Sequence, residues 1–514
     1  MSTEALEQPR QAAPRAEHAH GMWLALIVVV GGVLRFYQLG AQSLWHDELA
    51  SVELASNPPS LLWSDWMVRE TNPPLYYTLL HYWMRAFGDS EAAVRFPSAL
   101  LGSAVPPLIY VLGRRIASAR VGLIAATIAA LSALQLQYSQ ETRSYMLAIL
   151  ATLVTILALC QLADRLIDPR PPRGRFAEAS PWVLYVVGCS VALYSHTTLV
   201  LLPLLANVYF VWLWAARSPR ESGVAVRWGI ANAVCLLLWL WWGSLTLRQM
   251  ALPQPNYSWI HRLPLGESLL ITAYVYIPGH LGLASYLVGP VLLAIAALGL
   301  RRLRRDRAVL LAVFGLGAPL LIILISQRVP ILLPRTLLWA QFAVILAMAT
   351  SLAAIPGRLQ AGVLALLFAV QSVDSIIARQ EKEPWREVIS ALQRHMGPRE
   401  VLLFSSEAIG AHIQHYCREP ECQIRALRLL VPGEDLNRWA EGFSRAPQVR
   451  PDELPSVLAR YDRVYTLGRW TDDPQSYVQP LADEESPDGL GLPPNSPLPV
   501  RVWRARSAGK VAQP

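Results

Sequence analysis

Residues 22–38, MWLALIVVVGGVLRFYQ, decide the fold, because this segment is long and apolar enough to cross a bilayer as a helix. A helix crosses the ~30 Å hydrocarbon core with roughly 20 mostly apolar residues. The segment LWHDELAS at 44–51 follows and places His46, Asp47 and Glu48 at the mouth of this span. Ionisable residues near a membrane segment usually mark a site or a pathway. These carboxylates are therefore candidate functional residues, and a solvated loop edge is the alternative.

The whole chain has the composition of a polytopic membrane protein. Of its 514 residues, 53% are hydrophobic and only 16% are charged, which excludes an ordinary soluble protein of this length. Eleven segments are predicted to span, and they lie at 22–38, 93–112, 121–137, 145–163, 181–195, 197–215, 228–247, 280–300, 309–326, 336–354 and 360–378. The stretch 266–280 is either a loop helix or a twelfth span.

Arginine is concentrated on alternate connections of this predicted bundle. The arginine-rich connections are 113–120, 164–175, 217–227 and 301–307. By the positive-inside rule they face the cytoplasm, so the intervening connections and everything after Ala378 face outward. This topology accounts for the net charge of +8, and no nucleic-acid partner is expected.

The predicted fold is mainly α, with three regions along the chain. Residues 1–21 form a cytoplasmic tail, 22–378 a transmembrane domain, and 379–514 a small extracytoplasmic α/β domain, where the composition turns polar with short strand-like runs. In the first outer loop, residues 69–88 are amphipathic and broken by two prolines, which is typical of interfacial helices.

Two cysteines, Cys417 and Cys422, lie in the C-terminal domain in the sequence CREPEC. A disulfide between them suits an oxidising compartment, and two free thiols are the alternative. Zinc is disfavoured because further ligands would have to come from elsewhere in the chain. Since His46 also lacks a convincing ligand partner, neither a metal nor a cofactor is expected.

Other outer loops place polar residues on the same face as Asp47. They contribute Glu141, Arg143 and Tyr145 from YSQETRSY (138–145), His196 from SHTT (195–198), and Arg328 and Arg335 from QRVPILLPR (327–335). Carboxylates and guanidiniums beside apolar grooves suit a substrate with a lipid tail and an anionic head, and arginine pairs well with phosphate. Taken singly, each arginine also fits an interfacial anchor.

The fourth outer loop contains NYSWIHR at 256–262. Its Tyr257, Trp259 and Arg262 suit a lid over a sugar, and the same composition suits an interfacial aromatic belt. Together with Glu141, Tyr145 and His196, these are the candidate substrate-binding residues, although for His196 a structural role is the stronger alternative.

Several of these motifs, in this order, resemble the GT-C superfamily of polyprenyl-phosphate-sugar-dependent glycosyltransferases, which includes protein O-mannosyltransferases and the transferases that add aminoarabinose to lipid A. The resemblance rests on LWHDELAS (44–51), NPPLYYTLLHYWMRAFGDSEAAVRFPSALLG (72–102), YSQETRSY (138–145), YSHTT (194–198), PRT (334–336) and KEPWREVISAL (382–392). It covers the chain from the first span to about Leu392.

The resemblance implies an integral membrane enzyme that moves one sugar from a polyprenyl-phosphate donor to a lipid, glycan or protein acceptor on the outer face. The resemblance also implies that Asp47 is the general base and that Arg143 and Arg335 bind the donor phosphate. In the PRT motif (334–336), Thr336 stands where the family usually has tyrosine. Arg335 of the motif is present, but any stacking or hydroxyl contact that the tyrosine would make is absent.

The chemistry can also be argued from the residues. An acceptor hydroxyl needs a base as its proton leaves, which contributes ~10²–10⁴-fold, and Asp47 is the candidate. Glu48 either orients Asp47, raises its pKa by like charge or binds acceptor. Arg143 and Arg335 would stabilise the departing phosphate, and a single displacement inverts configuration.

Two other function classes compete with a transferase. A lipid-linked sugar transporter or flippase would also have many spans, but such proteins often carry internal repeats and midplane sites, and neither is evident here. A catalytically silent scaffold is the third class. Because the chain is rich in arginine, alanine and leucine and poor in lysine, we expect the inner membrane of a bacterium.

Overall fold

The computed structural model describes residues 12–167, 175–216, 222–252, 260–274, 283–380, 382–418, 422–431, 446–469, 474–487, 489–493 and 496–505. The chain divides into two compact units, which are described separately. Unit 1 comprises Met1–Leu39 and Ala55–Gln380, and unit 2 comprises Gly40–Leu54 and Glu381–Pro514. The segment 40–54 thus groups with the C-terminal residues, whereas the sequence analysis assigned it to the transmembrane domain. Side-chain hydrogen bonds to residues 386, 387 and 416 account for this grouping.

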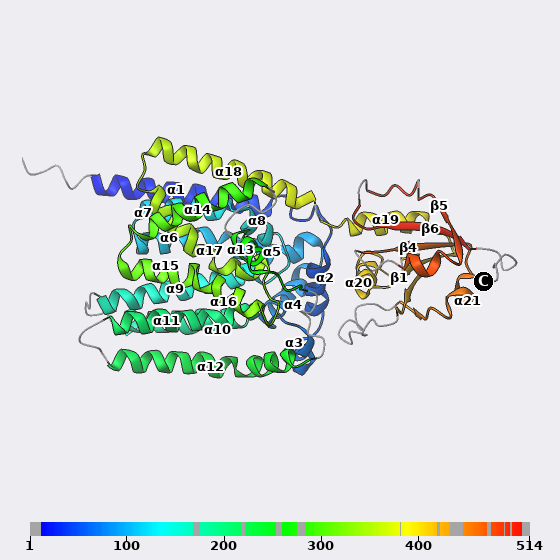
Figure 1. The fold of residues 1–514 in the computed structure, drawn as a ribbon, viewed down its shortest axis with the longest axis horizontal. Helices are drawn as coiled ribbons and strands as arrows, with labels where there is room; N and C mark the ends of the chain where they lie inside the picture. Colours follow the sequence, from blue (N-terminus) through cyan, green and yellow to red (C-terminus); the bar gives the residue numbers. More distant parts are fainter. Residues whose placement is uncertain are drawn as a thin grey trace, which may run out of the picture. The chain divides into compact units, whose positions relative to one another are not determined.

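All secondary-structure elements in the described part of unit 1 are helices (Figure 1). Its elements are α1 (Ala12–Phe36), α3 (Pro59–Leu62), η1 (Asp65–Arg69), α4 (Leu75–Phe87), α5 (Glu91–Ser103), α6 (Val105–Ile116), α7 (Ala119–Leu131), α8 (Ala133–Ser139), α9 (Tyr145–Ile167), α10 (Arg175–Leu193), η2 (Thr197–Val200), α11 (Leu201–Ala215), α12 (Ser222–Met250), α13 (Leu265–Tyr274), α14 (Leu283–Leu300), α15 (Arg305–Gly315), α16 (Gly317–Ser326), η4 (Pro334–Ala340), α17 (Gln341–Leu352) and α18 (Gly357–Gln380). The predicted mainly α fold is confirmed for this unit.

Among the described residues, seven helical segments are long and apolar enough to cross a membrane. They are His18–Phe36, Glu91–Ile116, Tyr145–Ile167, Thr197–Ala215, Gly223–Met250, Arg305–Ser326 and Pro334–Leu352. The bent pair α7 and α8 makes an eighth if it is one span. The remaining predicted spans fall on shorter apolar helices, Glu178–Leu193, Gly289–Leu300 and Gly357–Val373. The described part of the possible twelfth span is α13, a helix of 10 residues.

The spans differ in how deeply they lie in unit 1. In Pro334–Leu352, 94% of the apolar window is buried, against 11% for His18–Phe36 and 17% for Gly223–Met250. Helix α17 is therefore central, whereas α1 and α12 are peripheral. Close backbone approach makes the central packing possible: a Cβ on Gly299 of α14 would overlap the Ala347 carbonyl oxygen, so glycine is required there.

The span containing α7 and α8 bends by 58° between Leu131 and Ala133. The buried Arg35 of α1 donates to the carbonyls of Ala129 (3.2 Å) and Ala130 (3.1 Å), and its Nε donates to Ser139 Oγ (3.2 Å). The last carbonyls of a helix have no partner within the helix, so Arg35 caps α7 and at the same time holds the end of α8. The bend thereby fixes where the following connection begins.

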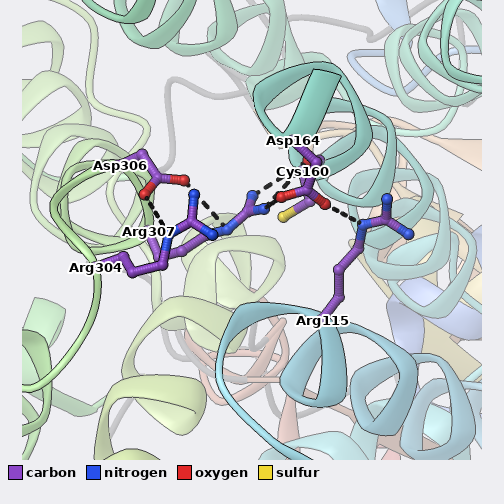
Figure 2. Close-up of polar contacts among 6 residues, drawn as sticks. All are labelled: Arg115, Cys160, Asp164, Arg304, Asp306 and Arg307. Atoms are coloured by element: carbon purple, nitrogen blue, oxygen red, sulfur yellow. Dashed lines mark hydrogen bonds and ion pairs between the residues drawn. The ribbon is translucent and has the colours of Figure 1, made fainter. Parts of the chain in front are cut away.

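A buried polar cluster ties α6, α9 and α15 together (Figure 2). The guanidinium of Arg307, 1% exposed, donates to the Cys160 carbonyl (3.3 Å) and forms an ion pair with Asp164. Asp164 also pairs with Arg115 (3.0 Å), and Asp306 lies 3.3 Å from Arg307. Arg307 belongs to one of the arginine-rich connections, but it serves in the interior as a link between three helices.

Unit 2 contains the helix α2 (His46–Ala55), apart from its last residue, and a six-stranded mixed sheet in the order β3-β2-β1-β4-β6-β5. Its other elements are α19 (Trp385–His395), β1 (Glu400–Phe404), α20 (Glu407–Tyr416), β2 (Ala426–Leu429), β3 (Gln448–Val449), α21 (Leu454–Leu458), β4 (Arg463–Leu467), α22 (Gln475–Val478), β5 (Ala482–Glu485) and β6 (Val500–Ala505). Strands β1 to β4 pair in parallel, and β6 pairs antiparallel with β4 and β5.

Helices cover both faces of this sheet (Figure 1). Along β1, Leu402 and Phe404 pack with residues of α19 and α20, while Val401 and Leu403 pack with residues of α21 and α22. Side chains alternate between the two faces of a strand, so the apolar run VLLF supplies both cores. Cys417 and Cys422 form a disulfide, with their Cα atoms 4.8 Å apart, which confirms the first of the two alternatives for this pair.

Candidate functional site

In unit 1, Arg143, Tyr145, His196 and Arg335 lie close together although they come from distant parts of the chain. Arg143 precedes α9, His196 caps the start of η2, and Arg335 lies in the first turn of η4. The Tyr145 and His196 rings are 5.6 Å apart, and the Arg143 guanidinium lies 6.0 Å from the Tyr145 ring centre. The connections that precede α9, α11 and α17 therefore meet at one place.

The pKa of His196 depends on its burial and on two neighbouring arginines of this group. Burial, followed by the charges of Arg143 and Arg335, lowers the pKa of His196 from 6.5 to about 3. The imidazole is therefore neutral at physiological pH. Arg143 and Arg335 therefore both lie close enough to His196 to lower its pKa, and they make the surroundings of the ring positively charged.

Backbone anchors hold the three connections in place. Ser98 Oγ of α5 donates to the Arg143 carbonyl (3.1 Å), and Tyr76 OH lies 2.7 Å from the same hydroxyl. His196 Nδ1 lies 2.9 Å from Thr198 Oγ1, which donates to the Thr336 carbonyl (3.1 Å). Thr336, which stands where the family usually has tyrosine, is thus linked to His196 by hydrogen bonds through Thr198.

Glu70, which the sequence analysis did not single out, also belongs to this group. It is 5% exposed, and its Oε1 accepts hydrogen bonds from the Asn72 backbone (2.9 Å) and from Tyr77 OH (3.1 Å). Burial raises the pKa of Glu70, while the charge of Arg143 and these hydrogen bonds act in the opposite direction. The only local signal in the sequence is that Glu70 lies two residues before the Asn-Pro-Pro motif at 72–74.

The remaining candidate residues of unit 1 differ in their surroundings: the Glu141 carbonyl accepts from the Arg143 backbone N–H (2.8 Å), which places Glu141 next to this group. Glu141 is buried and accepts from Gln137 Nε2 at 3.3 Å. Arg262 is exposed and donates to the Arg328 carbonyl (3.0 Å). Tyr257 and Trp259 lie outside the described residues. Of the candidate residues in the predicted lid (256–262), Arg262 lies in the described part, which begins at residue 260.

Asp47 and Glu48 lie in the first turn of α2, in unit 2. Carboxylates in a first turn are favoured by the helix dipole. Asp47 is half-buried, and its carbonyl accepts from Ser51 Oγ at 3.0 Å. Glu48 is fully buried, lies 3.7 Å from Lys382 Nζ and accepts from the Trp45 backbone N–H at 3.4 Å. The two adjacent acids thus differ in surroundings: Glu48 is paired inside the unit, and Asp47 is the more accessible.

Across the described residues, no three His, Cys, Asp or Glu side chains are grouped as a metal site requires. The positive charge near His196 is also more compatible with an anion than with a cation. Unit 1 thus presents two half-buried guanidiniums near His196, and unit 2 presents the half-buried carboxylate of Asp47.

Residues 71–242 match the sequence profile of the dolichyl-phosphate-mannose-protein mannosyltransferase family. This range includes Arg143, Tyr145 and His196. The search of curated proteins found no sequence relative.

Solved structures of similar fold cover nearly the whole chain. The structure of ArnT from Cupriavidus metallidurans in the apo state has a TM-score of 0.63 at 13% identity, covering 96% of this chain and 100% of ArnT. The same protein bound to undecaprenyl phosphate gives a TM-score of 0.60 at 12% identity, covering 96% and 99% of the two chains. The Archaeoglobus fulgidus oligosaccharyltransferase tethered to an acceptor peptide gives 0.51 at 12% identity, covering 94% and 76%.

Proposed function

We propose that this chain is a glycosyltransferase of the GT-C superfamily, which transfers a single sugar from a polyprenyl-phosphate donor to an acceptor outside the cytoplasm. The observation that carries the proposal is that Arg143 and Arg335 both lie near the buried His196. Their charges contribute to lowering its pKa, so the ring is neutral. Such a pair provides hydrogen bonds and charge for a phosphate without adding a third cation. ArnT, which shares the fold, has been crystallised with undecaprenyl phosphate.

In the proposed reaction, Asp47 accepts the proton of the acceptor hydroxyl as the oxygen lone pair attacks the anomeric carbon. The bond from that carbon to the phosphate oxygen breaks, and the polyprenyl phosphate leaves with the electron pair. Arg143 and Arg335 stabilise the charge that develops on the phosphate. Because attack and departure take place on opposite faces of the sugar, the anomeric configuration inverts.

Two observations support Asp47 as the base. Segment 40–54 is joined covalently to unit 1 at both ends, at Leu39 and at Ala55. Asp47 is also the more accessible of the two acids, as a base that meets an incoming hydroxyl has to be. Glu48, paired with Lys382, has the surroundings of a supporting residue.

A transporter of lipid-linked sugars is the second candidate function, since a phosphate-binding pair suits it equally. A transporter function, however, does not explain why the accessible residue 47 is an aspartate. The charge pattern of the connections favours the outer leaflet of a bacterial inner membrane for the reaction and an extracytoplasmic position for unit 2. The donor sugar class proposed is a hexose or pentose, with a lipid, glycan or protein acceptor.

The test is the variant Asp47→Asn in membranes that contain the chain, supplied with a panel of radiolabelled polyprenyl-phosphate sugars and envelope extract as acceptor. We expect transfer to fall at least ~10²-fold, because the general base is lost, while binding of undecaprenyl phosphate is unchanged. The matched control is Asp65→Asn, which alters an exposed acid paired with Arg248 and should leave transfer intact. Undiminished transfer in Asp47→Asn would reject Asp47 as the base.

A further inference from the structure

We propose that unit 2 positions the base: Tyr416, Glu387 and Arg386 hold the segment before α2 so that Asp47 keeps a fixed orientation. This inference rests on the proposed role of Asp47 and assigns the C-terminal residues a part in the reaction. We call the three the clasp residues. They contact residues 40–44 and not Asp47 itself, so they are positioning residues.

The first contact is made by the last residue of α20. The Leu44 backbone N–H donates to Tyr416 OH at 2.7 Å, and Leu44 is fully buried. A buried amide without a partner is costly, so the tyrosine hydroxyl fixes the backbone two residues ahead of α2. The disulfide of Cys417 begins at the next residue and restrains the end of α20.

The second contact centres on the buried hydroxyl of Ser43. Its Oγ donates to Glu387 Oε2 (2.8 Å) and accepts from the Arg386 backbone N–H (3.0 Å). The Arg386 guanidinium donates to the carbonyls of Ala41 (2.9 Å) and Gly40 (3.4 Å), and it pairs with Glu387 at 3.0 Å. The first turn of α19 therefore binds both backbone and side chain of the segment.

The third contact lies on the other side of Asp47. Glu48, fully buried, is 3.7 Å from Lys382 and accepts from the Trp45 amide. Asp47 is therefore flanked by Leu44 on one side and Glu48 on the other, each with a defined partner. A general base works only within hydrogen-bond reach of the proton it accepts, and misplacement by about 1 Å can cost ~10²-fold in rate.

The experiment compares Tyr416→Phe with Tyr465→Phe in the full-length chain in detergent. Both variants remove one hydroxyl from unit 2, but Tyr465 OH donates to Glu400 (3.2 Å) in the sheet. In Tyr416→Phe we expect hydrogen exchange of the peptide containing the Leu44 amide to accelerate about tenfold, and in Tyr465→Phe to stay at the wild-type rate. Equal exchange in both variants would refute the clasp, and this measurement needs no substrate.

The kinetic readout separates positioning from binding. With any donor that the wild type uses, Tyr416→Phe and Ser43→Ala should lower kcat roughly tenfold while KM for the donor stays within about twofold. Ser43→Thr, which keeps the hydroxyl, should restore kcat. If kcat is unchanged in Tyr416→Phe and Ser43→Ala, the positioning role of the clasp residues is refuted, whereas the proposed function is not affected. Retained transfer in Asp47→Asn overturns the proposed base, whereas the exchange result on Leu44 still decides the clasp.

Discussion

At the scale of single residues, the candidate site consists of the guanidiniums of Arg143 and Arg335 near the buried, neutral imidazole of His196. A protonated His196 would repel Arg143 and Arg335, and burial already disfavours its charged form. A neutral histidine adds no further positive charge beside the two arginines, which suits the proposed role of stabilising the negative charge that develops on a departing phosphate.

Replacing either arginine should weaken binding of the donor phosphate. We expect Arg143→Ala and Arg335→Ala to raise the Kd for undecaprenyl phosphate at least about tenfold, since a charge-assisted contact is lost. Native mass spectrometry in detergent measures this. The control is Arg248→Ala, an exposed arginine paired with Asp65, for which the Kd should not change. Equal Kd values in all variants would contradict the phosphate role.

The depressed pKa of His196 makes stability depend on pH in a definite direction. Between about 6.5 and about 3 the unfolded chain binds a proton that the folded chain does not. The contribution of His196 is thus complete above about pH 6.5 and declines as the pH falls toward 3. His412, buried in unit 2, has a lowered pKa with the same sign.

We therefore expect His196→Asn to lose less of its Tm between about pH 7 and about pH 5 than the wild type does. Thermal unfolding of the purified chain at the two pH values measures the difference, and His412→Asn is the comparison for the second buried histidine. The same slope of Tm against pH in His196→Asn and wild type would show that His196 is protonated in the folded state.

At the scale of elements, hydropathy predicted where the helices lie but not how they bend. Each predicted span falls on an apolar helix, because span length and composition are local properties. The bend after α7 was not predicted, since Ser132 gives no proline or glycine signal, and the cap that stabilises it comes from Arg35, far away in sequence. Glu70 was missed for a similar reason: its partner Arg143 lies in another connection.

The cluster in Figure 2 was also hidden in the sequence. Positive charge on a connection predicts orientation, and nothing local distinguishes the buried Arg307 from its exposed neighbours. Only the packing of α15 against α9 shows that Arg307 reaches Asp164 and the Cys160 carbonyl.

Removing this link should destabilise unit 1 more than removing its exposed partner. Arg307→Gln leaves the Cys160 carbonyl and Asp164 without their buried donor, and breaking a buried pair costs about 3–5 kcal/mol. Because Asp164 is 35% exposed, we expect a smaller loss, roughly 1–3 kcal/mol. Arg115→Gln, at a pair exposed to 37% and 35%, should cost under about 1 kcal/mol. Equal losses in thermal unfolding would contradict the structural role of Arg307.

At the scale of the whole molecule, the chain combines a helical unit with an α/β unit that includes the segment 40–54, which carries Asp47. The composition shift near residue 379 predicted the second unit, because a polar domain of this size is visible in the sequence. Its association with residues 40–54 depends on hydrogen bonds between positions more than 340 residues apart, which no local pattern encodes. The cysteine spacing left two alternatives, and only the folded chain decides between them.

The central claim is that Asp47 and the two arginines serve one phosphate-linked sugar. Its most direct test is an experimental structure of the full-length chain with undecaprenyl phosphate. We predict the phosphate oxygens within hydrogen-bond distance of Arg143 and Arg335, with the Asp47 carboxylate facing the same cavity. A phosphate bound away from both arginines, or an Asp47 that faces a separate environment, would contradict the claim.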